Sequence, residues 1–345
     1  MLSQRVVALI ALLAFMLLVI GTLLTGGNLG IADSGPTRVS FQIATGSTEG
    51  VYFPVGQAMA GLISHPLGVG RCDTAMVCGP AGVILSARTS EGTTDNLRSV
   101  NQGLVDSGFA DGDAIAAAVK GTGVFNRRPA RHLRVIAALF PEEAHLVVAV
   151  NSDIQSVADL RGKRVLMGPA DGSGLMRARA ILAAYRVRAR EVVSSEAADQ
   201  MLKDDKIDAY FAVAGVPLDS IKDLIAHHAA RLVPIDGEGR DRLIQMVPQL
   251  SPATIAAGAY PGTGAVETVS TRAWWVTRDS ESDPLIYGVA RALFNPANHD
   301  VLAASHPSAR EIGLDSAAVN PPAALHPGAA RFYREKGKLQ PGTAG

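Results

Sequence analysis

From residue 38 onward, short apolar runs rich in β-branched residues alternate with segments that have helical spacing. The strand-like runs cover residues 38–44, 83–87, 105–110, 133–139, 163–167 and 207–213. Most of them are followed by a turn rich in Gly, Ser or Thr and then by a helical segment that opens with residues such as Pro54 or Asp95. Strands that alternate with helices form parallel sheets whose ligand sites lie at the carboxyl ends of the strands. The sequence therefore predicts an α/β fold.

The charge balance limits the partners of such a protein. The chain of 345 residues carries 32 Lys+Arg against 32 Asp+Glu, so its formal net charge is zero. A nucleic-acid binder usually has a basic excess, so no nucleic-acid partner is expected. An apolar fraction of 48% with only 19% charged residues is enough to bury a sizeable core.

The N-terminal segment has the features of an export signal. Arg5 is the only charge in the first 30 residues, an apolar run covers residues 6–20, and Gly30-Ile31-Ala32 supplies small residues for cleavage. We expect residues 1–32 to be a signal peptide or, alternatively, an uncleaved membrane anchor that spans residues 6–24. Both readings place the rest of the chain in the periplasm, exported, and the second tethers it to the inner membrane.

No Pro/Ser-rich linker divides the remainder, so two domains would have to be joined by strands that cross between them. Residues 146–150 and 259–276 are the best crossover candidates, because they are apolar or Gly-rich and flank a middle third with its own strand-helix alternation. This predicts a discontinuous lobe 1 of residues 33–146 and 260–345, and an inserted lobe 2 of residues 147–259. A small ligand would lie in the cleft between them.

Cys72 and Cys78, the two cysteines, are six positions apart in a Gly/Pro-bounded segment. In an oxidising compartment they are able to close a small disulfide loop. The alternatives are two free buried thiols and a redox or metal role, which is disfavoured because no His flanks the pair.

Catalytic patterns are missing from the sequence. It has no G-x-S-x-G, P-loop, H-E-x-x-H or dinucleotide-binding motif, so we expect no enzyme activity and no cofactor. The adjacent His227 and His228 point to different helix faces, which argues against a shared metal. Acidic pairs such as Glu142-Glu143 are interpreted as solvated faces or helix caps.

Three turns are better candidates for binding. Gly46-Ser47-Thr48, Gly92-Thr93-Thr94 and Gly172-Ser173-Gly174 each precede a helix, where backbone N–H groups and the helix dipole favour an anion. Plain N-capping explains any one of them. Three from two proposed lobes favour a shared cleft for an anionic ligand.

Several segments of the chain are similar to the motifs of a known family. Residues 46–56 resemble T-G-x-x-x-G-V-Y-Y-P-x-G, and residues 325–337 resemble a terminal L-H-P-G-A-x-x-Y-Y-x-E-x-G. In both, the chain resembles the TAXI-family solute receptors of TRAP transporters. Residues 95–98, 159–165 and 207–217 are similar to its E-N-L-R, D-L-x-G-K-x-V and D-A-x-F-x-x-x-G-x-P pieces. The first and last motifs are the specific ones, because D-L-x-G-K is shared by many type II periplasmic binding proteins.

The resemblance implies a type II periplasmic-binding-protein fold, with two α/β lobes that close on a small organic acid or amino acid. It also implies a partner, a TRAP membrane permease that receives this solute. Carried over by position, the implied ligand-binding residues are Gly46, Ser47, Thr48 and Tyr52 in the first turn, Thr93 and Asn96 in the second, Asp113 after the third strand, and Ser173 in the inserted lobe. Tyr52 is as well explained by packing beside Pro54.

The chain departs from the family pattern at three places, of which one is the cysteine-bearing stretch of residues 71–80. Leu175 follows Gly172-Ser173-Gly174 where the family has Thr, and Asp111-Gly112-Asp113 replaces the family's Gln-x-Asp. The additional carboxylate would repel an acidic ligand or attract an amino group. Two other functions stay open: a membrane-anchored periplasmic ligand sensor on the same fold, and an enzyme on a binding-protein fold, for which the sequence offers no nucleophile-base set.

Overall fold

The computed structural model describes residues 39–339. The predicted signal peptide or anchor at residues 1–32 lies outside the described residues. Ten strands form one sheet. They are β1 Val39–Ala44, β2 Val83–Arg88, β3 Ser107–Asp111, β4 Leu133–Ala149, β5 Arg164–Gly168, β6 Arg190–Val193, β7 Ala209–Ala214, β8 Ala230–Val233, β9 Ser251–Ile255 and β10 Val266–Arg278.

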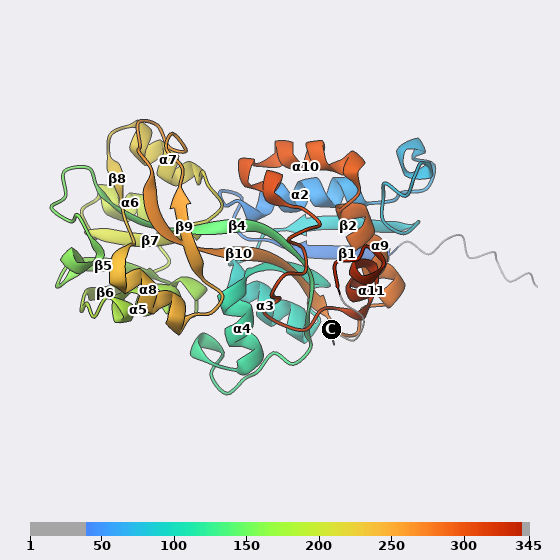
Figure 1. The fold of residues 1–345 in the computed structure, drawn as a ribbon, viewed down its shortest axis with the longest axis horizontal. Coiled ribbons are helices and arrows are strands. Elements are labelled where there is room, and N and C mark those ends of the chain that lie inside the picture. Colours follow the sequence, from blue (N-terminus) through green and yellow to red (C-terminus); the bar gives the residue numbers. More distant parts are fainter. Residues whose placement is uncertain (1–38, 340–345) are drawn as a thin grey trace, which may run out of the picture. The chain divides into compact units, whose positions relative to one another are not determined.

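From β1 to β8 each strand is followed by a helical segment, as the sequence predicts, whereas β9 leads directly into β10 (Figure 1). The α-helices are α2 Tyr52–Ile63, α3 Thr93–Gln102, α4 Gly112–Lys120, α5 Ser173–Ala184, α6 Ala198–Lys203, α7 Asp219–Ala226, α8 Gly237–Met246, α9 Asp283–Leu293, α10 His299–Ser305 and α11 Pro327–Glu335. Short 3-10 helices are η1 Gly70–Asp73, η2 Gly123–Phe125, η3 Val157–Leu160, η4 Pro296–Asn298 and η5 Pro307–Glu311. Pro54 lies in the first turn of α2, where its missing N–H is not needed.

The strand order is β2-β1-β3-β10-β4-β7-β5-β6, with β8 paired to β4 and β9 to β10. At one end β1 runs parallel to β2 and β3, and at the other β5 runs parallel to β6 and β7. The central strands β4 and β10 are antiparallel to each other and to the strands beside them. The predicted α/β class is confirmed, but the sheet is mixed, because β4 and β10 are antiparallel where the strand-helix alternation predicts a parallel sheet.

One long strand replaces two shorter ones expected from the sequence. Residues 133–139 and 146–149 belong to a single strand, β4, which continues through Pro141, Glu142 and Glu143 and ends before Val150. Glu142 is only 4% exposed, so its interpretation as a solvated face or cap is wrong. Two adjacent glutamates usually indicate the end of a strand. Here β4 continues through them, and they lie opposite Thr271 and Ser270 of β10.

Apolar side chains gather in separate cores along the sheet. One core draws on β1, β3, the first half of β4 and the second half of β10, together with α2, α9 and α11. Two further cores draw on residues between 144 and 269, including the second half of β4. Strand β4 therefore contributes Val135 to the first core and Leu146 to another, and β10 contributes Trp275 and Val269 in the same way.

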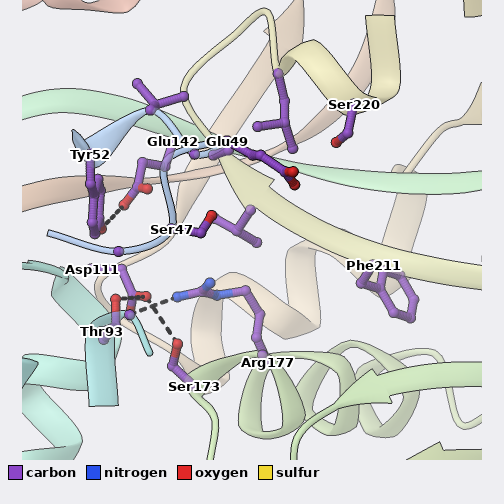
Figure 2. Close-up of a pocket in the computed structure, with 18 residues that line it drawn as sticks. Ser47, Glu49, Tyr52, Thr93, Asp111, Glu142, Ser173, Arg177, Phe211 and Ser220 are labelled. Carbon is purple, nitrogen blue, oxygen red and sulfur yellow. Dashed lines mark hydrogen bonds and ion pairs between the residues drawn. The ribbon is translucent and has the colours of Figure 1, made fainter. Parts of the chain in front are cut away.

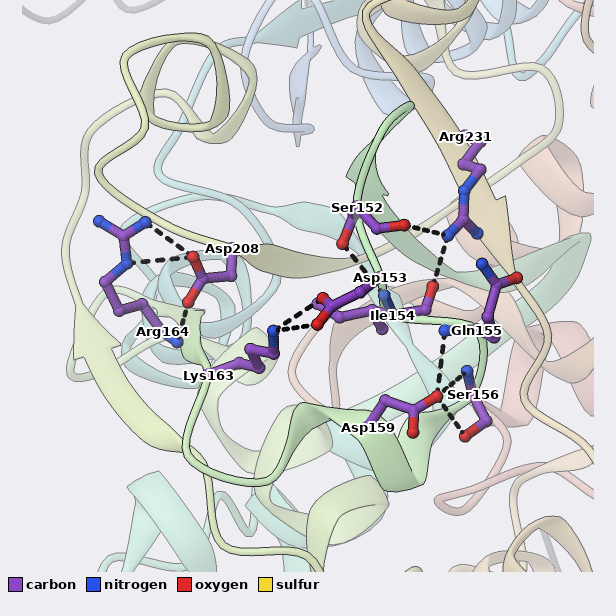
Figure 3. A network of polar contacts seen from close by, with 10 residues as sticks. All are labelled: Ser152, Asp153, Ile154, Gln155, Ser156, Asp159, Lys163, Arg164, Asp208 and Arg231. Atoms are coloured by element: carbon purple, nitrogen blue, oxygen red, sulfur yellow. Dashed lines mark hydrogen bonds and ion pairs between the residues drawn. The ribbon is translucent and has the colours of Figure 1, made fainter.

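The segment that carries the D-L-x-G-K pattern serves the fold (Figure 3). The Asp159 carboxylate accepts hydrogen bonds from the backbone N–H of Gln155 and Ser156 and so caps η3. Lys163 donates to Asp153. Arg164, the first residue of β5, donates to Asp208. These contacts fix the entry into β5, away from the cavity described below.

Cys72 and Cys78 form the predicted disulfide. Within residues 39–339, no helix is both long enough and apolar enough to cross a membrane.

Candidate functional site

A cavity of about 390 Å³ lies at the ends of the strands where several helices begin. Its wall combines the turn after β1, the starts of α3 and α5, the end of β3, the middle of β4 and the end of β7 (Figure 2). The lining residues are Gly46, Ser47, Glu49, Gly50, Val51, Tyr52, Gly92, Thr93, Asp111, Glu142, Ser173, Gly174, Arg177, Phe211, Val213, Ala214, Leu218 and Ser220. The carboxyl ends of parallel strands are where α/β sheets bind ligands.

The structure brings most of the predicted ligand residues to this cavity. Those that line it are Gly46, Ser47, Tyr52, Thr93 and Ser173.

The other predicted residues lie elsewhere. Thr48 lines a neighbouring cavity with Pro54 and His306. Asn96 and Asp113 are not among the residues that line the main cavity. Asn96 is fully buried, and Asp113 lines a separate cavity with Met176 and Gln249. Both side chains bond to partners within the protein.

Asn96 joins the turn after β1 to the end of β3. Its side chain is fully buried, and its amide nitrogen donates to the backbone carbonyls of Thr45 and Phe109, at 2.7 Å each. Its amide oxygen accepts from the Ser90 hydroxyl at 2.6 Å. Every polar atom of the side chain is thus used within the protein, so Asn96 positions the cavity wall.

Asp113 pairs with Arg177, a residue of α5 that sequence reasoning missed. The Arg177 guanidinium donates to both carboxylate oxygens of Asp113 and lies 2.9 Å from the Asp111 carboxylate. Burial raises the pKa of Asp113 to about 6, against the lowering effect of Arg177. Burial by itself lowers the pKa of Arg177, but Asp111 and Asp113 outweigh it and hold that pKa above its usual value.

Asp111 accepts hydrogen bonds from the first residues of several helices. It is the N-cap of α4, where it accepts from the backbone N–H of Ala114 at 3.2 Å. The hydroxyls of Thr93, at the start of α3, and Ser173, at the start of α5, donate to its other oxygen at 3.0 and 3.3 Å. Figure 2 shows these side chains converging on Asp111.

Glu142 lies on β4 at the other side of this group. The Tyr52 hydroxyl donates to its Oε2 at 2.9 Å, and the Tyr52 ring packs edge-on against Phe109 and Phe140. Burial, with Asp111 nearby, raises the pKa of Glu142 well above its usual value. Burial also raises the pKa of Tyr52. The Tyr52 side chain thus packs in the core and at the same time lines the cavity.

The sequence held only partial signals for the missed residues. Arg177 is four positions after Ser173, which places the two side chains on one face of α5. Asp111 departs from the family pattern, which by itself does not predict a site residue. Glu142 gave no signal, because only the pairing of β4 with β10 buries it.

Residues 39–339 contain no group of three or more His, Cys, Asp or Glu side chains placed to hold a metal ion. His227 and His228 follow the end of α7, and His227 bonds to the Asp223 carbonyl.

Sequence comparison assigns the family. The model of the NMT1-like family matches residues 43–337, most of the chain. The chain belongs to the NMT1-like family.

Solved structures show which fold this NMT1-like protein shares. MatC from Rhodopseudomonas palustris, with bound malate, is similar with a TM-score of 0.51 and 14% identity, over 87% of this chain and 97% of MatC. A TctC solute binding protein from Polaromonas has a TM-score of 0.47 and 12% identity, over 89% of this chain and 100% of that chain. The alkanesulfonate-binding protein SsuA from Xanthomonas axonopodis pv. citri, bound to MOPS, has a TM-score of 0.44 and 15% identity, over 86% and 84% of the two chains. The likeness to MatC confirms the predicted solute-binding-protein fold.

Proposed function

We propose that the protein is an extracytoplasmic solute-binding protein that captures a small organic acid or amino acid in the cavity beside Asp111. The observation that carries this proposal is a cavity of about 390 Å³ in which hydroxyl, carboxylate and guanidinium groups converge. Ligand pockets typically combine this size range with a few convergent polar groups. The printed names of the similar structures, among them a solute binding protein and a protein with bound malate, agree with it.

The proposed mechanism is closure of two lobes on the ligand. Lobe 1 would comprise residues 33–146 and 260–345, and lobe 2 residues 147–259. The cavity wall draws on both, because Tyr52 and Thr93 come from the first and Ser173 and Phe211 from the second. Binding shifts the equilibrium between open and closed forms by the ligand's differential affinity for the closed form. No covalent step is part of this mechanism.

Delivery to a TRAP-type membrane permease rests on the TAXI-like segments, of which residues 46–56 and 325–337 are the most specific. Export is supported by the signal-like residues 1–32. A second candidate is a membrane-anchored sensor on the same fold. The apolar run within residues 6–24 favours it, because the run approaches the length of a membrane-spanning helix.

The test is native mass spectrometry of the protein purified from its own periplasm, followed by denaturation and identification of the released molecule. We expect a stoichiometric organic acid or amino acid. The mass of the protein itself reports whether residues 1–32 have been removed, and an uncleaved N-terminus would favour the sensor.

A variant pair locates the binding site. Ser47→Trp places a bulky ring at the cavity wall and should abolish binding of the released molecule. Ser280→Trp, in an exposed turn after β10, is the control and should bind normally. The proposed function would be contradicted if the purified protein holds no ligand and its melting temperature does not change with any of a panel of organic acids and amino acids.

A further inference from the structure

The position that an anionic ligand would take at the helix starts is already filled by the protein. The donors at the beginnings of α3, α4 and α5 all point to the Asp111 carboxylate. Thr93 and Ser173 therefore give their hydroxyl hydrogens to Asp111. A ligand carboxylate placed there would meet a buried negative charge and no free hydroxyl donor.

The positive charge at the cavity is also paired within the protein. Among the described residues that line the cavity, Arg177 is the one basic residue. Its guanidinium is occupied by Asp113 and Asp111. Glu49, Asp111 and Glu142 line the cavity with Arg177, so carboxylates outnumber basic groups in the cavity wall.

Glu142 has the capacity to accept another donor. Its Oε2 is bonded to the Tyr52 hydroxyl, whereas Oε1 accepts no hydrogen bond from a described residue. Figure 2 shows Glu142 and Asp111 on neighbouring parts of the cavity wall. A buried carboxylate with a free oxygen lacks a compensating partner, and a cationic donor supplies both charge and hydrogen bonds.

We infer that the ligand carries a cationic group, in its simplest form an ammonium, which donates to the free Oε1 of Glu142 and lies beside the fully bonded Asp111 carboxylate. This deepens the proposed function and rests on it, since it chooses the ammonium-bearing solutes over simple dicarboxylates. The turn of residues 46–50 also brings a carboxylate, that of Glu49, to the cavity wall, which again favours a cationic group over an anionic one.

A proton should leave when this cation binds. Burial and Asp111 favour the neutral form of Glu142 in the empty cavity, because they raise its pKa, while Arg177 and the Tyr52 hydroxyl act in the opposite direction. An ammonium beside Glu142 favours the ionised form. Calorimetry in buffers of different ionisation enthalpy would detect the released proton.

The test is isothermal titration with matched pairs of solutes, in which the second member adds one ammonium group to the first: succinate with L-aspartate, and glutarate with L-glutamate. 4-Aminobutyrate, in which an aminomethyl group replaces one carboxylate of succinate, is compared with succinate as well. We expect the amine-bearing member of a pair to bind and its dicarboxylate counterpart to bind at least tenfold more weakly. A dicarboxylate that binds as well as its amine-bearing counterpart overturns the inference and leaves the proposed function intact.

Variants then assign the selectivity to Glu142. Glu142→Gln keeps the shape of the side chain. It should weaken the binding of the amine-bearing solute by about tenfold or more, the usual effect of losing a hydrogen bond to a charged group. Glu143→Gln, the next residue on β4, points to the other face and is the control, expected to bind as wild type. Circular dichroism confirms folding, and a folded Glu142→Gln protein with unchanged amine affinity overturns the inference. If no solute of either kind binds and the native protein is empty, the proposed function fails as well.

Discussion

At the scale of single residues, burial decides which carboxylates matter. Glu142 and Glu143 are adjacent on β4, but the alternation of a strand sends their side chains to opposite faces. Glu142 faces the cavity, and Glu143 lies near Glu311 and Arg272. Both are removed from water, so both are more stable in the neutral form than an exposed glutamate.

Glu143 should make the stability of the protein depend on pH. Burial raises its pKa from 4.5 to about 7. The folded state therefore binds more protons than the unfolded state between these two values, so this contribution to stability is lost as pH rises from about 4.5 to about 7. Above that window Glu143→Gln should be more stable than wild type by on the order of 2 kcal/mol, with little difference at pH 4.

Urea unfolding of both proteins across this range measures the effect. Other buried groups, such as His145, titrate equally in both proteins and cancel in the difference. A difference that does not change with pH would contradict the raised pKa of Glu143.

At the scale of elements, α5 is attached to the end of β3 and the start of α4 through charged side chains. Arg177 lies on α5, and its partners Asp111 and Asp113 lie at the end of β3 and in the first turn of α4. A buried ion pair adds little by itself, but removing one partner leaves uncompensated charge. The contact therefore fixes the position of α5 at the cavity wall.

Arg177→Met should lower the free energy of unfolding by about 3 kcal/mol, because it leaves Asp111 and Asp113 buried without a counter-charge. Adding Asp113→Asn should restore part of the loss, and the double-mutant cycle gives the coupling between the two side chains. Arg179→Met is the control on the same helix, since Arg179 is exposed and its pair with Glu191 should contribute less than about 1 kcal/mol. Equal losses for Arg177→Met and Arg179→Met would show that the buried cluster is not a stabilising contact.

At the scale of the whole molecule, β4 and β10 run through more than one core. The first half of β4 packs with β1 and β3, and its second half packs with β5 and β7. A bend along these two strands would allow the cavity wall to open and close without breaking either end of the sheet. In binding proteins, a few hinge residues change their φ and ψ angles when the domains close.

We therefore expect a ligand to make the protein more compact. Small-angle X-ray scattering with and without the molecule released from the native protein should show a smaller radius of gyration in the bound state. Ser47→Trp, which fills part of the cavity, should show no such change on addition of the molecule. Identical scattering curves for empty and loaded wild-type protein would contradict lobe closure.

Much of the fold is readable from local patterns. The strands at residues 39–44, 83–88 and 164–168 agree closely with the predicted runs, because each run is short, apolar and bounded by turn residues. The Gly/Ser/Thr turns also identified the region of the cavity, since such residues begin helices after strands. Ser47, Thr93 and Ser173 line the cavity for this reason.

The sequence by itself determined the α/β class and the positions of several strands and of the turns that line the cavity, because these depend on residues that are close along the chain. Only the tertiary structure decided that Arg177 meets Asp111 and Asp113, and that Glu142 is buried beside Tyr52. These contacts join segments that are far apart in sequence, and the pKa of a carboxyl group depends on what surrounds it rather than on its neighbours along the chain. The charge of the cavity, and with it the kind of ligand we propose, is a property of that packing.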